Sequence, residues 1–245
     1  NKTMFEKTLE KALNSKIFDK IIVSSDNVDI KKKFKYKFTF IKRPKYLSKD
    51  PSTVTDVMMH TCRQLDLLEK RFNMMVVLSV TNPFFDEQDI IKSIKTFKKS
   101  NSEGLLSISE FSAPPYNAWI KKKNYLEPAF KNSNYKFTKS TECPKTYFSN
   151  GALRLVNLEK FLKKKIFHKL KLTFYETKNH KSIDIDTKYE YKISNGAIIN
   201  PDKSEEEFFS NIIKETLDEQ DEALSKTSFK FISESLFVSD AFNEN

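Results

Sequence analysis

Short apolar runs alternate with helical periodicities through the first 110 residues of the chain. The runs predict buried strands at 20–24, 36–41, 74–78 and 104–109. Between them, apolar residues at three- and four-residue spacing predict helices that begin after Thr3, near residue 27, near Thr53 and after Asp86. Strands separated by single helices require right-handed crossovers, so the pattern predicts an α/β fold. We expect a mostly parallel central sheet with helices on both faces.

The alternation stops between residues 112 and 149 and then resumes. Within that stretch, aromatic residues such as Trp119 are spread among lysines and asparagines. This composition predicts an excursion of extended segments, of which a hairpin that meets a partner is one form. A strand (152–156), a helix (158–165) and a further strand (170–176) follow.

We interpret the chain as one domain with an insertion and a tail. Residues 1–195 form the main domain, and residues 112–149 are its insertion. Residues 196–245 are expected to be an acidic, helical C-terminal extension, with a helix around residues 203–224. A final apolar stretch, 229–242, must cover another surface or remain exposed.

The composition narrows the class of protein. The chain of 245 residues is 38% hydrophobic and 31% charged, as in folded globular proteins. No apolar run approaches the roughly 18 residues of a membrane-spanning helix. The two cysteines, Cys62 and Cys143, predict reduced thiols and no disulfide framework. We therefore expect a cytoplasmic protein without a membrane span.

The formal net charge of +10 is unevenly distributed along the chain. Residues 201–245 contain four lysines and twelve acidic residues, so the positive charge lies in the preceding part. It is nearly all lysine, without the arginine forks and interleaved aromatic residues that read nucleic-acid bases. We expect no nucleic-acid partner. The lysines predict either a solvated surface or a field that favours polyanionic small molecules such as nucleotides.

Polar side chains follow three of the predicted strands, at the edge where open parallel sheets bind ligands. They are Ser24 and Asp26 after the first strand, Arg43 after the second, and Ser79 and Thr81 after the third. Farther along the chain, Asp184 and Asp186 are two residues apart, so in an extended stretch both carboxylates project to the same side. Paired carboxylates with phosphate oxygens commonly hold Mg²⁺, although this spacing also occurs in ordinary turns and helix caps.

Five segments in a fixed order carry a resemblance to a known family. They are V-S-S-D (23–26), R-P-K-Y-L-S-K-D (43–50), L-S-V-T-N-P (78–83), N-G-A (150–152) and S-I-D-I-D-T (182–187). Their order and spacing resemble the acylneuraminate cytidylyltransferases, which are the CMP-sialic acid synthetases and their relatives for other nonulosonic acids. The resemblance covers residues 2 to about 195. It implies a Rossmann-like nucleotidyltransferase fold.

The resemblance implies CTP-dependent transfer of CMP to a nonulosonic acid of the sialic, pseudaminic or legionaminic type. The anomeric hydroxyl of the sugar acid attacks the α-phosphorus of CTP, pyrophosphate leaves, and a CMP-sugar forms for surface glycan synthesis. Asp184 and Asp186 are then the catalytic residues and hold Mg²⁺ or Mn²⁺. The resemblance also implies a homodimer built through residues 112–149.

The remaining site residues follow from the same resemblance. Asn150 and Lys139 are expected to contact the sugar acid. The nucleotide-binding residues are expected to be Ser24, Asp26, Arg43, Ser79 and Thr81.

The chain departs from the family pattern in three places. Family members carry an upstream strand and a phosphate loop, A-R-x-G-S-K-R, that are absent before Thr3, so the chain is either an N-terminal truncation or a relative that has lost triphosphate binding. Ser79 and Val80 replace Gln and Pro of the family's L-Q-P-T-S-P turn. Lys139 is the nearest cation where an arginine is expected beside the sugar carboxylate, and a lysine supplies a point charge and no planar fork.

Two other functions stay open on the sequence alone. One is a different sugar nucleotidyltransferase, of the CMP-Kdo type. The other is a non-catalytic, nucleotidyltransferase-like binding protein.

Overall fold

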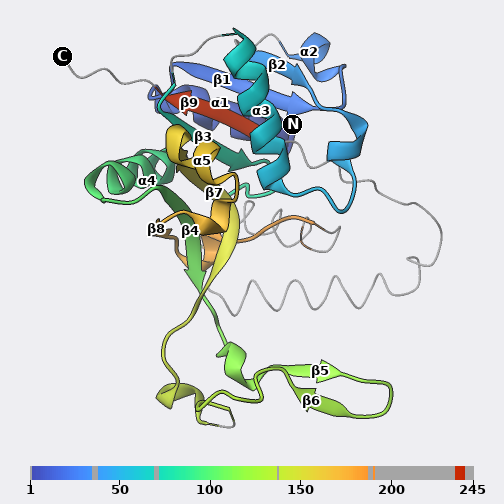
Figure 1. The fold of residues 1–245 in the computed structure, drawn as a ribbon, viewed down its shortest axis with the longest axis vertical. Coiled ribbons are helices and arrows are strands. Elements are labelled where there is room, and N and C mark those ends of the chain that lie inside the picture. Colours follow the sequence, from blue (N-terminus) through green and yellow to red (C-terminus); the bar gives the residue numbers. More distant parts are fainter. Residues whose placement is uncertain are drawn as a thin grey trace.

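The computed structural model describes residues 2–34, 38–68, 72–136, 138–186, 190 and 235–240. Within these ranges a seven-stranded sheet has the order β2-β1-β9-β3-β7-β4-β8 (Figure 1). Its strands are β1 (Lys20–Ser25), β2 (Thr39–Lys42), β3 (Met74–Ser79), β4 (Gly104–Glu110), β7 (Tyr147–Asn157), β8 (Leu172–Glu176) and β9 (Ser235–Asp240). The predicted α/β class is confirmed.

The sheet is mixed in its pairings. Strands β1, β2, β3, β4 and β8 run in one direction, whereas β7 and β9 run antiparallel to both of their neighbours. Five strands therefore run in one direction, as expected for a mostly parallel sheet, and β7 and β9 run against them. The chain between β4 and β7 contains no crossover helix, and without one it returns in the opposite direction.

One interior position in the sheet, between β1 and β3, belongs to a strand from the far end of the sequence. Strand β9 pairs with β3 over residues 235–240 on one side and with β1 over residues 235–239 on the other. These residues fall in the stretch that the sequence analysis assigned to a C-terminal extension. At least this part of the extension is integral to the sheet. The helix expected around residues 203–224 lies outside the described residues.

Helices cover both faces of the sheet, as the alternating pattern predicts. They are α1 (Met4–Ser15), α2 (Ile30–Lys33), α3 (Val54–Leu68), α4 (Glu87–Lys99) and α5 (Leu158–Lys164). Thr3 and Asp86 form capping boxes that begin α1 and α4, because each accepts a backbone N–H and the third helical residue bonds back. One buried cluster joins α1 and α4 to the sheet, and a second joins α3 and α5 to it.

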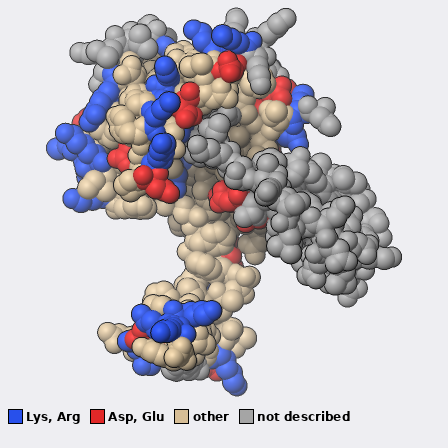
Figure 2. Space-filling model, turned by 90° about the vertical axis from the view of Figure 1, so that its right-hand side faces the viewer, with Lys and Arg blue, Asp and Glu red and all other residues tan. Residues whose placement is uncertain are grey.

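The excursion extends away from the sheet as a separate lobe (Figure 1). It contains an antiparallel hairpin of β5 (Trp119–Lys121) and β6 (Leu126–Pro128). Exposed Lys121, Lys122 and Lys123 follow one another at its turn. Lys and Arg side chains are spread over the body of the protein and gather again on this lobe (Figure 2).

In the described ranges, no helix has both the length and the hydropathy needed to cross a membrane.

Candidate active site

The candidate site is built around the turn after β3, at residues 79–82. The Ser79 and Thr81 hydroxyl oxygens lie 2.7 Å apart, and the Thr81 amide also donates to the Ser79 hydroxyl. The Thr81 carbonyl accepts the Ile185 amide at 2.9 Å. The Asn82 amide group donates to the carbonyls of Asn150 and Ile183. These bonds bring three segments that are distant in sequence to one edge of the sheet.

Asp184 lies against this turn and against Gly151. The Thr81 hydroxyl donates to its carboxylate, while its Oδ1 is buried and has no hydrogen-bond partner among the described residues. Gly151 has φ +76°, in the left-handed region that favours glycine, and a Cβ there would lie 3.4 Å from Asp184 Oδ2. The positive φ is therefore the reason for glycine in the N-G-A motif, and it places the turn in van der Waals range of this carboxylate.

The electrostatic surroundings of Asp184 disfavour its ionised form. Burial is the main reason that its pKa is raised, and the neighbouring carboxylates of Asp186 and Glu190 add to the shift. The Thr81 hydrogen bond and the positive charge of Arg154 act in the opposite direction and do not cancel it. A carboxylate held in this way gains from a nearby cation.

The donor set fits a hard divalent cation. Asp184 offers an unpartnered buried oxygen, and the exposed Asp186 follows two residues later. Among the described residues no group of three or more His, Cys, Asp or Glu side chains is arranged to hold a metal. Two carboxylates are nevertheless the usual protein share of a Mg²⁺ site, because phosphate oxygens and waters complete its octahedron.

Arg154 is a site residue that sequence reasoning missed. It lies on β7 between the fully buried Leu153 and Leu155, and burial lowers the pKa of its guanidinium while Asp184 opposes that change. The sequence does contain a signal for Arg154, because an arginine inside an apolar strand needs a polar or acidic partner when it is buried. Asn82 was missed as well, because its two bonds to distant carbonyls leave no local pattern.

Asn150 joins the site, but its side chain is fully engaged by the protein. Its Oδ1 accepts from the Ser107 hydroxyl at 2.6 Å and from the Ala152 amide at 3.2 Å. Its Nδ2 donates to Ser109 at 2.9 Å and to Thr177 at 2.6 Å. In this arrangement the carboxamide ties β7 to β4 and to the end of β8, and no polar atom is left over for a ligand.

We expect Asn150→Ala to lower the free energy of unfolding by about 2–4 kcal/mol, because buried hydroxyl groups that bond to Asn150 lose a hydrogen-bond partner. Urea denaturation of the ligand-free protein measures this change. Asn132→Ala, at an exposed position of the excursion, is the matched control and should change stability by less than about 0.5 kcal/mol. Equal stability of the two variants would show that Asn150 is not structural.

A second polar group lies at the ends of β1 and β2. Arg43 is buried, and its guanidinium donates to the Ser24 hydroxyl at 3.3 Å and to the Ser24 carbonyl at 2.5 Å. Asp26 has a buried Oδ1 without a hydrogen-bond partner among the described residues. His60 lies within electrostatic range of Arg43. Burial lowers the pKa of His60, and the positive charges of Arg43 and Arg63 lower it further. These residues form a polar cluster at this end of the edge.

The predicted site residues thus fall into three places. Ser79, Thr81, Asn150, Asp184 and Asp186 come together around the turn after β3. Ser24, Asp26 and Arg43 stand at the ends of β1 and β2, along the same edge. Lys139 is exposed on the excursion, at the N-terminus of a short 3₁₀ turn (Ser140–Glu142). Contact between Lys139 and the sugar acid stays a prediction.

A helix-covered α/β sheet with a polar site at its carboxyl edge is an arrangement that nucleotidyltransferases share with other α/β proteins. A solved structure of 4-diphosphocytidyl-2C-methyl-D-erythritol synthase from Anaerococcus prevotii has the same fold, with a TM-score of 0.54 and 15% identity. The similarity covers 80% of this chain and 86% of that one.

Sequence comparison then identifies the family. The family model described as cytidylyltransferase matches residues 1–227, so the chain belongs to the cytidylyltransferase family. The pseudaminic acid cytidylyltransferase of Campylobacter jejuni is 25% identical over 189 residues, which cover 76% of this chain and 81% of that protein.

A second relative is a longer protein of Helicobacter pylori. It is named pseudaminic acid cytidylyltransferase and UDP-2,4-diacetamido-2,4,6-trideoxy-beta-L-altropyranose hydrolase, and it is 29% identical over 165 residues. The matched region covers 66% of this chain and 31% of that protein, so the chain spans about a third of the length of this relative.

Proposed function

We propose that the protein is a nucleotidyltransferase that transfers CMP from CTP to the anomeric hydroxyl of a nonulosonic acid. The observation that carries the proposal is the meeting of Thr81, Gly151 and Asp184 at the carboxyl edge of the sheet in a member of this family. Pseudaminic acid is the sugar acid to test first, because both similar proteins carry it in their names. The CMP-sugar would serve surface glycan synthesis.

Asp184 and Asp186 are proposed to hold Mg²⁺ or Mn²⁺ against the triphosphate. When bound, the cation would neutralise the charge that develops on the phosphate oxygens. The chain's own residues position the carboxylate: the Thr81 hydroxyl orients Asp184, and Gly151 provides the positive φ of the adjoining turn. Arg154 limits the repulsion among Asp184, Asp186 and Glu190, since its charge opposes theirs. Catalysis of this kind depends on alignment and on charge neutralisation.

Substrate choice tests the function directly. We expect the complete gene product, with Mg²⁺ and pseudaminic acid, to release pyrophosphate from CTP about 100-fold faster than from ATP. Raising the salt concentration should increase KM for CTP, because screening weakens the attraction of a triphosphate to a lysine-rich surface. Mass spectrometry of the CMP-sugar is the measurement. Equal turnover of both nucleotides, or CTP binding without any product, would contradict the proposal and favour a non-catalytic relative.

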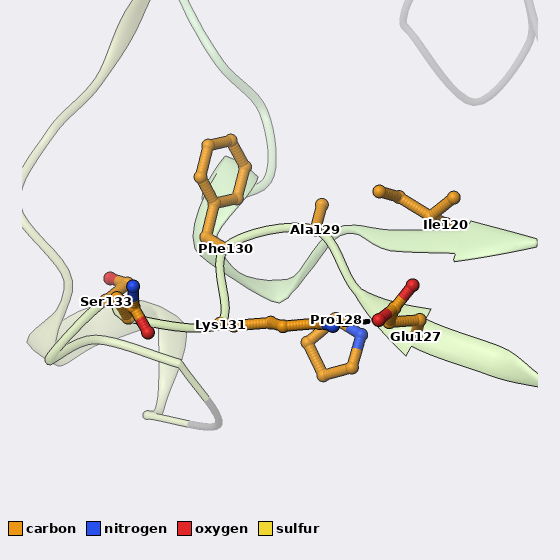
Figure 3. Close-up of a pocket in the computed structure, with 8 residues that line it drawn as sticks. Ile120, Glu127, Pro128, Ala129, Phe130, Lys131 and Ser133 are labelled. Atoms are coloured by element: carbon orange, nitrogen blue, oxygen red, sulfur yellow. Dashed lines mark ion pairs between the residues drawn. The ribbon is translucent and has the colours of Figure 1, made fainter.

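We also propose that the protein is a homodimer that contacts its partner through residues 112–149. The support is the exposure of apolar side chains on this lobe: Trp119 is 49% exposed, Tyr125 65% and Leu126 59%. Figure 3 shows Ile120, Ala129 and Phe130 projecting to the same side of the hairpin, beside a groove of about 590 Å³. Contiguous exposed apolar surface of this kind is typical of protein interfaces.

Replacing one exposed aromatic residue tests the dimer. Trp119→Asp should raise the dimer dissociation constant by about 100-fold or more, because a central aromatic anchor is lost and a charge is buried in its place. Light scattering over a concentration series measures it. Phe174→Asp, at an exposed position of β8 outside the excursion, is the control. A monomeric wild type, or a dimer unaffected by Trp119→Asp, would contradict this interface.

The cytoplasm is the proposed location. Neither Cys62 nor Cys143 forms a disulfide in the structure, as is usual in a reducing compartment.

A further inference from the structure

A lysine close to the paired carboxylates is held in an ion-pair network on α4. Lys181 ends a 3₁₀ turn (Asn179–Lys181) that lies between β8 and Asp184. Its Nζ lies 2.5 Å from Asp86 Oδ2 and 2.7 Å from Asp89 Oδ2. The side chain of Asp89 is only 8% exposed, so water screens its contact with Lys181 less than on an open surface, whereas Asp86 is 39% exposed.

The acceptors of this network are themselves fixed. Asp86 is the N-cap of α4 and Asp89 is its third residue, and the two exchange the bonds of a capping box. The Tyr175 hydroxyl donates to Asp89 Oδ1 at 2.9 Å from β8. Lys11 donates from α1 to the carbonyl of Pro83, three residues before the cap. Lys181 is therefore joined to a rigid part of the fold.

Among the described residues, the segment that carries Asp184 is attached to the rest of the fold by the Thr81 hydroxyl bond to Asp184, by Lys181 and by two backbone bonds. The Ile183 carbonyl accepts from the Asn82 amide group at 3.3 Å, and the Ile185 amide donates to Thr81 at 2.9 Å. The side chain of Ile185 is also buried. Lys181 and the two backbone bonds fall at alternate positions along the chain. Asp184 follows the attached Ile183, and Asp186 follows the attached Ile185. Within the part of the chain that the structure describes, the backbones of Asp184 and Asp186 make no hydrogen bond to the sheet.

The charge balance favours the ion pairs. Burial alone would lower the pKa of Lys181, but the hydrogen bonds to Asp86 and Asp89 outweigh it and raise the pKa. For Asp86, burial acts to raise the pKa, and the Lys181 and Asp89 contacts reverse the direction. The Lys181 side chain therefore stays charged. Because it is already bonded to Asp86 and Asp89, it is a poor candidate for direct contact with substrate.

We propose that Lys181 is a positioning residue that sets the location of the paired carboxylates by anchoring their segment to the N-terminus of α4. The inference rests on the proposed function in one respect, namely that Asp184 and Asp186 bind the metal. The anchoring itself rests on contacts that are independent of any ligand. Lys181 does not touch the reacting groups and acts through the segment that carries them.

Hydrogen exchange in the ligand-free chain tests the anchoring. Lys181→Met should accelerate exchange of the Ile185 amide by about tenfold, because the Thr81 bond opens more often when one attachment is lost. Lys181→Arg should restore protection, since it keeps the charge and the two acceptors. Lys178→Met, at an exposed position of the same loop, is the matched control and should leave exchange unchanged. Unchanged protection in Lys181→Met would overturn the proposal.

Metal affinity tests the consequence for the site. In the complete gene product with CTP, the apparent Kd for Mn²⁺ should rise about tenfold in Lys181→Met, as for other residues that orient metal ligands, and return in Lys181→Arg. Tyr175→Phe, which keeps the ion pair, should show a smaller change in the same direction. Faster exchange with unchanged Mn²⁺ affinity would overturn the positioning role. A wild type that binds no Mn²⁺ would refute the metal part of the proposed function, and the exchange result would still decide the anchoring.

Discussion

Asp184→Asn and Asp186→Asn should each reduce CMP-sugar formation by about 10³-fold or more without unfolding the protein. Each substitution keeps the shape of the side chain and removes one of the two negative charges proposed to hold the cation at the triphosphate. The measurement is turnover by the complete gene product with CTP, a nonulosonic acid and Mg²⁺. Asp29→Asn is the matched control, because Asp29 is exposed and makes no capping bond through its side chain.

Stability should change in the opposite direction to activity for Asp184→Asn. The pKa of Asp184 is raised above its ordinary value of 3.8 in the folded protein, so the folded state holds the proton more tightly than the unfolded state. The resulting stabilisation is fully present below pH 3.8 and is lost as the pH rises through the folded-state pKa. At neutral pH the ionised group is therefore a net cost.

Denaturation at two pH values checks this sign. The asparagine variant should be at least as stable as the wild type at pH 7, and it should lose that advantage below pH 4. Turnover within about tenfold of the wild type by either variant would refute the catalytic assignment. A large loss of stability at pH 7 would show instead that Asp184 serves the fold.

Phe237→Pro should lower the free energy of unfolding by about 3 kcal/mol or more. Residue 237 pairs with Ile22 on one side and with Val77 on the other, so it lies in the interior of the sheet. A proline there lacks the backbone donor, and its ring does not fit a central strand. Urea denaturation followed by circular dichroism measures the loss. Amides of Ile22 and Val77 should exchange faster in the same variant.

The control for this prediction is a proline in a strand outside the sheet. Ile120 pairs only within the two-stranded hairpin of the excursion. Ile120→Pro should therefore cost less of the global stability than Phe237→Pro. Equal losses of unfolding free energy in the two variants would contradict the position of β9 between β1 and β3. Residues 235–240 would then belong to a peripheral extension.

The sequence by itself determined most of the elements and the outline of the site. Apolar runs such as Met74–Ser79 and helices with capping boxes after Thr3 and Asp86 are local signals, and the structure has them where the pattern predicts them. The edge of the sheet that carries the site also followed from strand order along the chain. The resemblance then pointed to Asp184 and Asp186 as the residues to examine.

The tertiary structure alone decided strand pairing and the state of the polar side chains. The antiparallel direction of β7, the insertion of β9 and the bond from Asn82 to Ile183, 101 residues away, all join segments whose separation hides them from any local pattern. The same holds for the saturated carboxamide of Asn150 and for the anchoring of Lys181. Hydrophobic periodicity reports which face of an element is buried. The partner that satisfies each buried polar group depends on how distant segments meet, and only the folded chain fixes that.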